Sequence, residues 1–135
     1  MTKYVIGFLF NSKDGVWLIR KNRPEWQKGK LNGIGGHVED GESYAQAMRR
    51  EFFEEAGVDI PDWKEFCQMH FPEAIVACFK ATGDYKVTQK TDGELYLVIK
   101  NSLPYNVIPN LRWLIPMAMY EVEEYMTEVT MPKDK

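Results

Sequence analysis

Residues 43–57 carry the clearest boundary signals in the chain and describe one amphipathic helix. Ser43 is a suitable N-cap, and Gln46 three residues later completes a capping box, in which the two side chains bond backbone amides that the helix leaves unpaired. Gly57 is a suitable end, because glycine adopts the left-handed conformation after a helix without a steric penalty. One face is apolar at helical spacing and should face the core; its members are Ala45, Met48, Phe52 and Ala56.

The rest of the chain predicts strands and one further helix around this element. The expected strands are Tyr4–Phe10, Val16–Lys21, Ala74–Ala81, Tyr85–Thr88 and Leu95–Lys100, the first two as a hairpin, with a loop over Asn22–Gly36. A second helix opens at Pro109 or Asn110 and runs from Leu111 to about Met126, with apolar residues at Leu111, Leu114, Ile115, Ala118 and Val122. Strands interspersed with two helices predict a mixed α/β layer architecture.

The size and composition of the chain predict a single soluble domain over residues 1–135, with a loose tail at about 131–135. It has 135 residues, of which 44% are hydrophobic and 27% charged, as in ordinary globular proteins. No apolar run is long enough to span a bilayer and no signal-peptide pattern is visible, so we expect a cytoplasmic protein and no membrane partner. Two isolated cysteines predict buried thiols, and a net charge of −3 predicts no stable nucleic-acid partner.

The predicted helix 43–57 also carries a concentrated acidic face. Glu51, Glu54 and Glu55 lie three and four residues apart, and like charges at this spacing repel. Arg50 can neutralise part of this charge, since it stands four residues before Glu54. A divalent cation would neutralise it more completely, because Mg²⁺ takes oxygen ligands from a few carboxylates and from substrate phosphates. A solvated helix face paired with lysines remains the alternative at this point.

The spacing of these residues resembles the signature of a known family. Gly36, five residues, Glu42, seven residues and then the run Arg50-Glu-Phe-Phe-Glu-Glu-Ala-Gly-Val58 fill every specified position of the Nudix box. The resemblance implies an α/β Nudix fold, which is an α/β/α sandwich with a mixed β-sheet. Residues 29–39 and 109–116 are similar to the corresponding segments of MutT-type members, which hydrolyse nucleoside triphosphates, including oxidised ones.

The resemblance also implies a role for each residue of the box. The implied metal ligands are the backbone carbonyl of Gly36 and the carboxylates of Glu51, Glu54 and Glu55, with Mg²⁺ as the cofactor and Mn²⁺ as a possible substitute. Either Glu51 or Glu54 would activate the attacking water. Arg50 would act with these carboxylates and form a structural ion pair with Glu42.

Residues outside the box are expected to contact the substrate. Arg20, Lys21 and Arg23 belong to a basic segment, residues 20–30, that could hold phosphates, with Arg23 the first candidate. The resemblance places Asn32 at a position that reads the base in enzymes acting on oxidised purines, and a turn at Asn32-Gly33 is the alternative. Asp92 or Glu94 could add a carboxylate to the metal site. Where MutT-type members often have an aromatic ring that stacks on a purine, this chain has Val107 and Ile108, so the base preference stays open.

The function that follows is a Mg²⁺-dependent hydrolysis of a phosphoanhydride in a nucleoside diphosphate linked to another group. The expected substrate is a small-molecule nucleotide, a (d)NTP or modified (d)NTP, cut to NMP and pyrophosphate. The alternatives are ADP-ribose, a dinucleoside polyphosphate or capped RNA as substrate, or a module that binds a nucleotide without cutting it. A homodimer is possible, since homodimers are common in the family.

Overall fold

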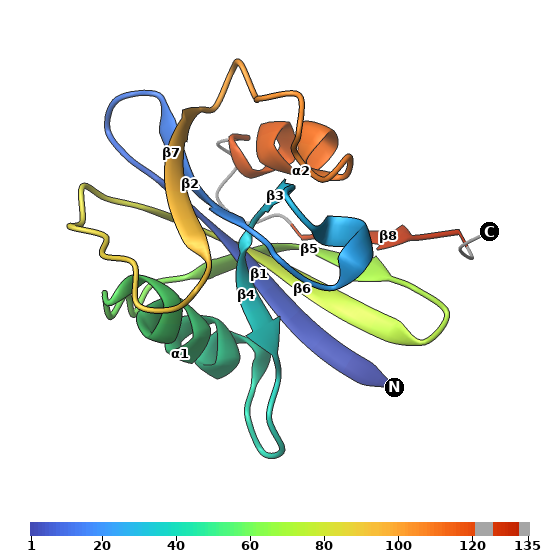
Figure 1. Cartoon of the computed structure of the whole chain (residues 1–135). Helices are drawn as coiled ribbons and strands as arrows, with labels where there is room; N and C mark the ends of the chain where they lie inside the picture. The colour runs from blue at the N-terminus through green and yellow to red at the C-terminus, as the bar shows by residue number, and fades with distance from the viewer. Residues whose placement is uncertain (121–125, 133–135) are drawn as a thin grey trace.

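The computed structural model describes residues 1–120 and 126–132 and consists of a mixed β-sheet with a helix on each face (Figure 1). The strands are β1 (Thr2–Phe10), β2 (Gly15–Arg20), β3 (Leu31–Asn32), β4 (Ile34–His37), β5 (Lys64–His70), β6 (Ala74–Thr82), β7 (Glu94–Ile99) and β8 (Thr127–Thr130). The helices are η1 (Glu25–Gln27), a 3-10 turn, and the α-helices α1 (Tyr44–Ala56) and α2 (Leu111–Ala118).

Helix α1 has the boundaries that its capping residues predict. The Ser43 side chain accepts a hydrogen bond from the Gln46 amide at 3.1 Å, and the Gln46 side chain accepts one from the Ser43 amide at 2.8 Å. Gly57 ends the helix with φ of 73°. Met48, Phe52 and Ala56 are buried as predicted. The prediction for Ala45 is wrong, because its methyl group is exposed; the buried or packed residues of the first turns are Tyr44 and Ala47.

Strand β1 lies at the centre of the sheet and organises the other strands. The sheet order is β3-β2-β1-β6-β5-β8, and β1 runs parallel to β6 along its whole length. Two strands share the other edge of β1: β4 pairs antiparallel with its first half, and β2 pairs antiparallel with its end. Strand β7 extends the sheet beyond β2. This arrangement places the chain around Gly36 directly beside α1.

The sheet separates two apolar cores, which makes the fold an α/β/α sandwich. Successive side chains of a strand point to opposite faces, so Val5 and Leu9 of β1 pack toward α1, whereas Phe8 and Phe10 pack toward α2. The α1 side is completed by residues such as Met48, Phe52 and Trp63, and the α2 side by residues such as Phe66, Leu111 and Leu114. The α/β fold class predicted from the sequence is confirmed.

Residues 83–93 form an anchored connection, and the predicted strand Tyr85–Thr88 is wrong. The amide of Gly83 donates to the carbonyl of Phe10, and the amides of Thr88 and Lys90 donate to carbonyls in the last turn of α1, at 2.9 Å and 3.0 Å. The final carbonyls of a helix have no partner within the helix. The segment satisfies two of them, so its amides are not available to a neighbouring strand.

Helix α2 is shorter than the predicted span to about Met126. Its buried residues agree with the prediction up to Ala118, where the helix ends. The Lys80 ammonium group donates to the carbonyls of Ala118 and Tyr120 at 3.0 Å each, so it caps the helix end from β6. Val122 lies outside the described residues, and the chain enters β8 after Met126.

Strands β3, β4, β5 and β8 are absent from the sequence-based prediction. Strand β3 falls inside the expected loop Asn22–Gly36, β4 begins inside it and ends one residue beyond, and β8 runs parallel to β5. The Met131 amide donates to the carbonyl of His70 at 2.8 Å, while residues 133–135 of the expected loose tail lie outside the described residues. Cys67 and Cys78 are free and buried, as expected. Within the described part of the chain, no helix has the length and apolar character needed to cross a membrane.

Candidate active site

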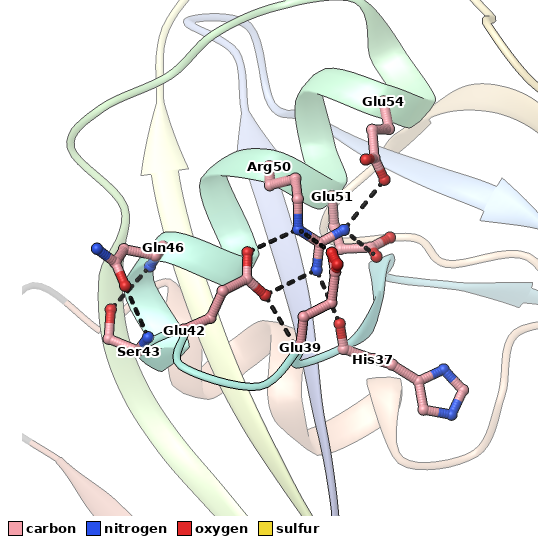
Figure 2. Close-up of polar contacts among 8 residues, drawn as sticks. All are labelled: His37, Glu39, Glu42, Ser43, Gln46, Arg50, Glu51 and Glu54. Atoms are coloured by element: carbon pink, nitrogen blue, oxygen red, sulfur yellow. Dashed lines mark hydrogen bonds and ion pairs between the residues drawn. The ribbon is translucent and has the colours of Figure 1, made fainter.

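Arg50 on α1 is the centre of a polar network that joins the helix to the loop before it (Figure 2). Its guanidinium donates to both carboxylate oxygens of Glu42, at 2.7 Å from Nε and 2.9 Å from Nη2. Nη1 donates to Glu51 at 2.8 Å and to Glu54 at 3.1 Å, and Nη2 also donates to the carbonyl of His37 at 2.9 Å. The planar guanidinium can bond several acceptors at fixed angles, which a lysine cannot do.

The Glu42 carboxylate holds the loop in place from both sides. Besides Arg50, it accepts a hydrogen bond from the Glu39 amide at 2.9 Å. The Arg50 hydrogen bonds hold the pKa of Glu42 below its usual value, and the same carboxylate raises the pKa of Arg50. The expected ion pair of Glu42 and Arg50 is thus formed in the structure.

Gly36 and Glu51 are in close contact across β4 and α1. A Cβ atom added to Gly36 would lie 2.5 Å from Oε2 of Glu51, so only glycine leaves room for this carboxylate against the strand. The Glu51 side chain is mostly buried, and desolvation raises its pKa, although its hydrogen bond to Arg50 acts in the opposite direction. Burial disfavours the charged form of a carboxyl group, so this site is one that a counter-charge would stabilise.

Glu54 and Glu55 lie on the same side of α1 but have different partners. Glu54 is half exposed and bonds Arg50 through the longest of the Arg50 hydrogen bonds. Glu55 accepts a short hydrogen bond from the hydroxyl of Thr91, in the connection that precedes β7. The helix therefore presents three carboxylates, of which two converge on one arginine and the third on a neighbouring loop.

The two candidates for an additional carboxylate differ in their surroundings. Glu94, at the start of β7, forms an ion pair with Arg20 on β2 and accepts a hydrogen bond from the Tyr96 hydroxyl at 3.1 Å. Asp92 is exposed in the turn between Thr91 and Gly93. Arg20 is consequently engaged with a carboxylate in this structure.

The candidate substrate-binding residues lie outside the Arg50 network. Arg23 is exposed at the start of the segment that leads into η1, and the backbone of Lys21 bonds residues 29 and 30, just before β3. Asn32 on β3 uses its side chain locally: it accepts from the Gly33 amide at 2.8 Å and donates to Gln27 at 3.2 Å. These three residues remain proposals for substrate contact.

Two contacts of the site, made by Thr91 and Glu39, could not be predicted from a sequence motif. Thr91, which bonds Glu55, lies 36 positions after it in the chain and belongs to no motif. Glu39 lies 3.3 Å from Nε of Arg50 but is one acid among several in its segment. His37 contributes its carbonyl, while its ring packs against Tyr4 with 4.5 Å between ring centroids.

The donors of this site fit a hard divalent cation in kind. The carboxylates of α1 lie beside β4, where Gly36 has no side chain to cover the backbone. Carboxylate and carbonyl oxygens are the donors that Mg²⁺ prefers. In the arrangement seen, no three acidic, histidine or cysteine side chains among residues 1–120 and 126–132 are grouped closely enough to enclose an ion. The hydrogen bonds from Arg50 and Thr91 account for this spread, because they draw Glu54 and Glu55 to different partners.

The chain thus combines a mixed sheet that has a helix on each face with a partly buried arginine network and an acidic helix beside a strand that contains two glycines. The NUDIX domain family model matches residues 2–125. The chain therefore belongs to the Nudix family, and it is a Nudix hydrolase. No protein with a curated description matches the chain.

Solved structures of the family share the fold over most of the chain. A MutT structure from work on Aliivibrio salmonicida and Vibrio cholerae is 25% identical with a TM-score of 0.70, covering 85% of this chain and 97% of the other. MutT from Burkholderia pseudomallei is 17% identical with a TM-score of 0.76, covering 87% and 98%. A MutT protein from Bacillus halodurans is 20% identical with a TM-score of 0.74, covering 96% and 91%.

Proposed function

We propose that this Nudix hydrolase cuts a phosphoanhydride in a (d)NTP or modified (d)NTP, with Mg²⁺, and releases NMP and pyrophosphate. The observation that carries the proposal is the Arg50 network, which sets Glu51 against Gly36 and Glu54 on the adjoining turn. The similarity to MutT structures over nearly their whole length supports a small nucleotide as substrate. The buried free thiols are compatible with a reducing cytoplasm, where we place the enzyme.

The proposed ligands are the Gly36 carbonyl and the carboxylates of Glu51, Glu54 and Glu55. Bound there, Mg²⁺ or Mn²⁺ would neutralise phosphate charge and lower the pKa of the attacking water. Glu54 can change partners, because it is half exposed and, among the residues that the structure describes, its hydrogen bond comes from Arg50 alone, at 3.1 Å. The same Arg50 nitrogen, Nη1, also donates to Glu51 at 2.8 Å and would keep that carboxylate in position.

The proton transfer is assigned to a carboxylate of α1. Water attacks the α or the β phosphorus, its proton passes to Glu51 or Glu54, and the anhydride bond from that phosphorus to the bridging oxygen breaks, so that NMP and pyrophosphate are the products. Both carboxylates accept hydrogen bonds from Arg50, so the two candidates for the proton acceptor lie side by side on α1. Arg23 and Lys21 are proposed to hold the departing phosphates, and Asn32 to contact the base.

A coupled phosphate-release assay tests the reaction directly. The purified chain is incubated with Mg²⁺ and a panel of canonical and oxidised dNTPs, NTPs, ADP-ribose and diadenosine polyphosphates, each with and without inorganic pyrophosphatase. Phosphate that appears from triphosphates only with pyrophosphatase supports NMP and pyrophosphate as products. Direct release of phosphate would contradict the proposed products, and activity confined to ADP-ribose or a dinucleoside polyphosphate would contradict the substrate.

Substitutions in the acidic face test the assignment of the site. Glu54→Gln and Glu55→Gln should each lower turnover by about two orders of magnitude or more, because each removes a ligand charge while preserving shape. Glu128→Gln on β8 is the matched control and should retain wild-type turnover. A folded Glu54→Gln/Glu55→Gln double variant with full activity would refute the metal assignment. Isothermal titration with Mn²⁺ alone gives a second readout, in which both single variants should bind more weakly.

A further inference from the structure

Strand β7 forms an edge of the sheet whose outer side is open. Its whole length pairs antiparallel with β2, from Arg20 opposite Glu94 to Gly15 opposite Ile99. Among the described residues, no strand pairs with its other side, and Figure 1 shows β7 at the margin of the sheet. An open edge presents unpaired backbone groups that can bond another strand.

The backbone groups that face outward can be assigned from one hydrogen bond. The Lys100 amide donates to the carbonyl of Asp14 at 2.8 Å, so residue 100 directs its backbone toward β2. Backbone direction alternates along a strand of an antiparallel pair. Leu95, Leu97 and Ile99 therefore direct their amides and carbonyls outward. The Ile99 carbonyl also accepts from Ser102 at 3.1 Å and keeps a second lone pair.

The side chains of this edge lack the usual protection against pairing. Natural edge strands are often interrupted by proline, by charges in mid-strand or by a covering segment. Residues 95–99 contain neither proline nor charge. Leu97 is 46% exposed and Ile99 is 61% exposed, both on the face of the sheet that carries α1. An apolar, uncharged edge of this kind is suited to a strand partner.

The sequence of β7 is complementary to itself in one antiparallel register. A two-fold axis at Leu97 places Leu97 opposite Leu97 of the partner subunit, with their outward backbone groups bonded to each other. The same register sets Leu95 opposite Ile99 of the partner subunit, and Tyr96 opposite Val98 of the partner subunit. Apolar side chains in directly opposite positions stabilise a strand pair.

The charged ends of the strand select this register. It places Glu94 opposite Lys100 of the partner subunit at both ends of the pair. Within one chain, Arg20 already bonds Glu94, and Lys100 lies 3.9 Å from Asp14. The row across the joined sheets would therefore alternate in sign, from Arg20 through Glu94 to Lys100 and Asp14 of the partner subunit. Opposite charges in facing positions stabilise a pair, and like charges weaken it.

We propose that β7 is a dimerisation edge, which pairs antiparallel with β7 of a second copy of this chain about a two-fold axis at Leu97. The inference is independent of the proposed reaction, because it rests on the strand and its charges. The test is the molar mass by light scattering and sedimentation. The mass should rise from 15.8 kDa toward twice that value as concentration increases to about 0.5 mM, since a small interface associates weakly. A monomer throughout this range overturns the proposal.

Leu97→Lys tests the centre of the edge. It sets two ammonium groups opposite each other at the axis and should raise the dimer dissociation constant about tenfold or more. Tyr105→Lys adds the same charge at a fully exposed position off the strand and should leave the dissociation constant unchanged. A dimer that persists unchanged in Leu97→Lys, or that is lost equally in Tyr105→Lys, assigns the interface elsewhere and overturns the proposal.

Complementary charge variants test the register itself. Glu94→Lys alone and Lys100→Glu alone each set like charges opposite one another and should be monomeric. An equimolar mixture of the two should dimerise again, because every facing pair is then of opposite sign. Circular dichroism and thermal denaturation establish that each variant is folded. Failure of the mixture to associate, with both variants folded, refutes this register, and the Leu97→Lys comparison stands if either variant is unstable.

Discussion

The Glu42 to Arg50 ion pair makes a quantitative prediction about stability. In Glu42→Gln, the amide keeps one acceptor for Arg50 but replaces the second with an N–H group that faces the guanidinium. A hydrogen bond to a charged group contributes about 1.5–3 kcal/mol. The two side chains are 24% and 19% exposed, so solvent screens part of the charge. We expect Glu42→Gln to lower the free energy of unfolding by about 2 kcal/mol. A fully buried pair would give a larger loss, and a fully exposed pair a loss under about 1 kcal/mol.

Thermal and urea denaturation check this value. For a chain of this size, about 2 kcal/mol corresponds to a fall in Tm of roughly 6 °C. Glu39→Gln is the matched control, because Glu39 is 58% exposed and lies 3.3 Å from the same Arg50 nitrogen. Glu39→Gln should lower the free energy of unfolding by about 0.5 kcal/mol or less. Equal losses in the two variants would refute the reasoning that partial burial and paired geometry make Glu42 the dominant partner.

Three further substitutions test separate features. Gly36→Ala places a methyl group against the Glu51 carboxylate and should reduce kcat at least tenfold, measured in the coupled phosphate assay, while the protein remains folded. Ser43→Ala removes the N-cap of α1 and should cost about 1 kcal/mol in urea denaturation, and an unchanged midpoint would contradict the capping role. Hydrogen bonds from Ser12 hold the pKa of Asp84 below its usual value, so their stabilisation is complete above the unfolded-state pKa and is lost as pH falls through the folded-state pKa. The Tm difference between wild type and Ser12→Ala should therefore shrink in acid, and a difference independent of pH would contradict this assignment.

The acidic helix and its neighbours were the most predictable part of the molecule. Its boundaries are set by local interactions, because Ser43 and Gln46 bond each other and Gly57 supplies the end. The ion pair of Glu42 and Arg50 followed from the family resemblance rather than from spacing alone. Thr91 could not be predicted, since its contact with Glu55 depends on how a distant connection folds back onto the helix.

The missed strands show where local patterns fail. Strand β4 contains Gly35 and Gly36, which disfavour a strand by propensity, yet the close approach of β1 excludes any side chain at Gly35. In contrast, residues 85–88 have strand propensity, but the chain passes the end of α1, whose carbonyls bind the amides of Thr88 and Lys90. Tertiary contacts decide both cases.

The anchored connection 83–93 has a consequence for engineering the enzyme. Its ends are fastened at Gly83 to β1 and at Thr88 and Lys90 to α1, and Ser12 bonds Asp84 next to the first anchor. Residues 85–87 span the interval between these anchors. A library confined to Tyr85 and Lys86 would vary exposed positions between the anchors, while Val87, which packs against the core beneath α1, stays unchanged. These two positions can therefore be changed without disturbing the helix that holds the carboxylates.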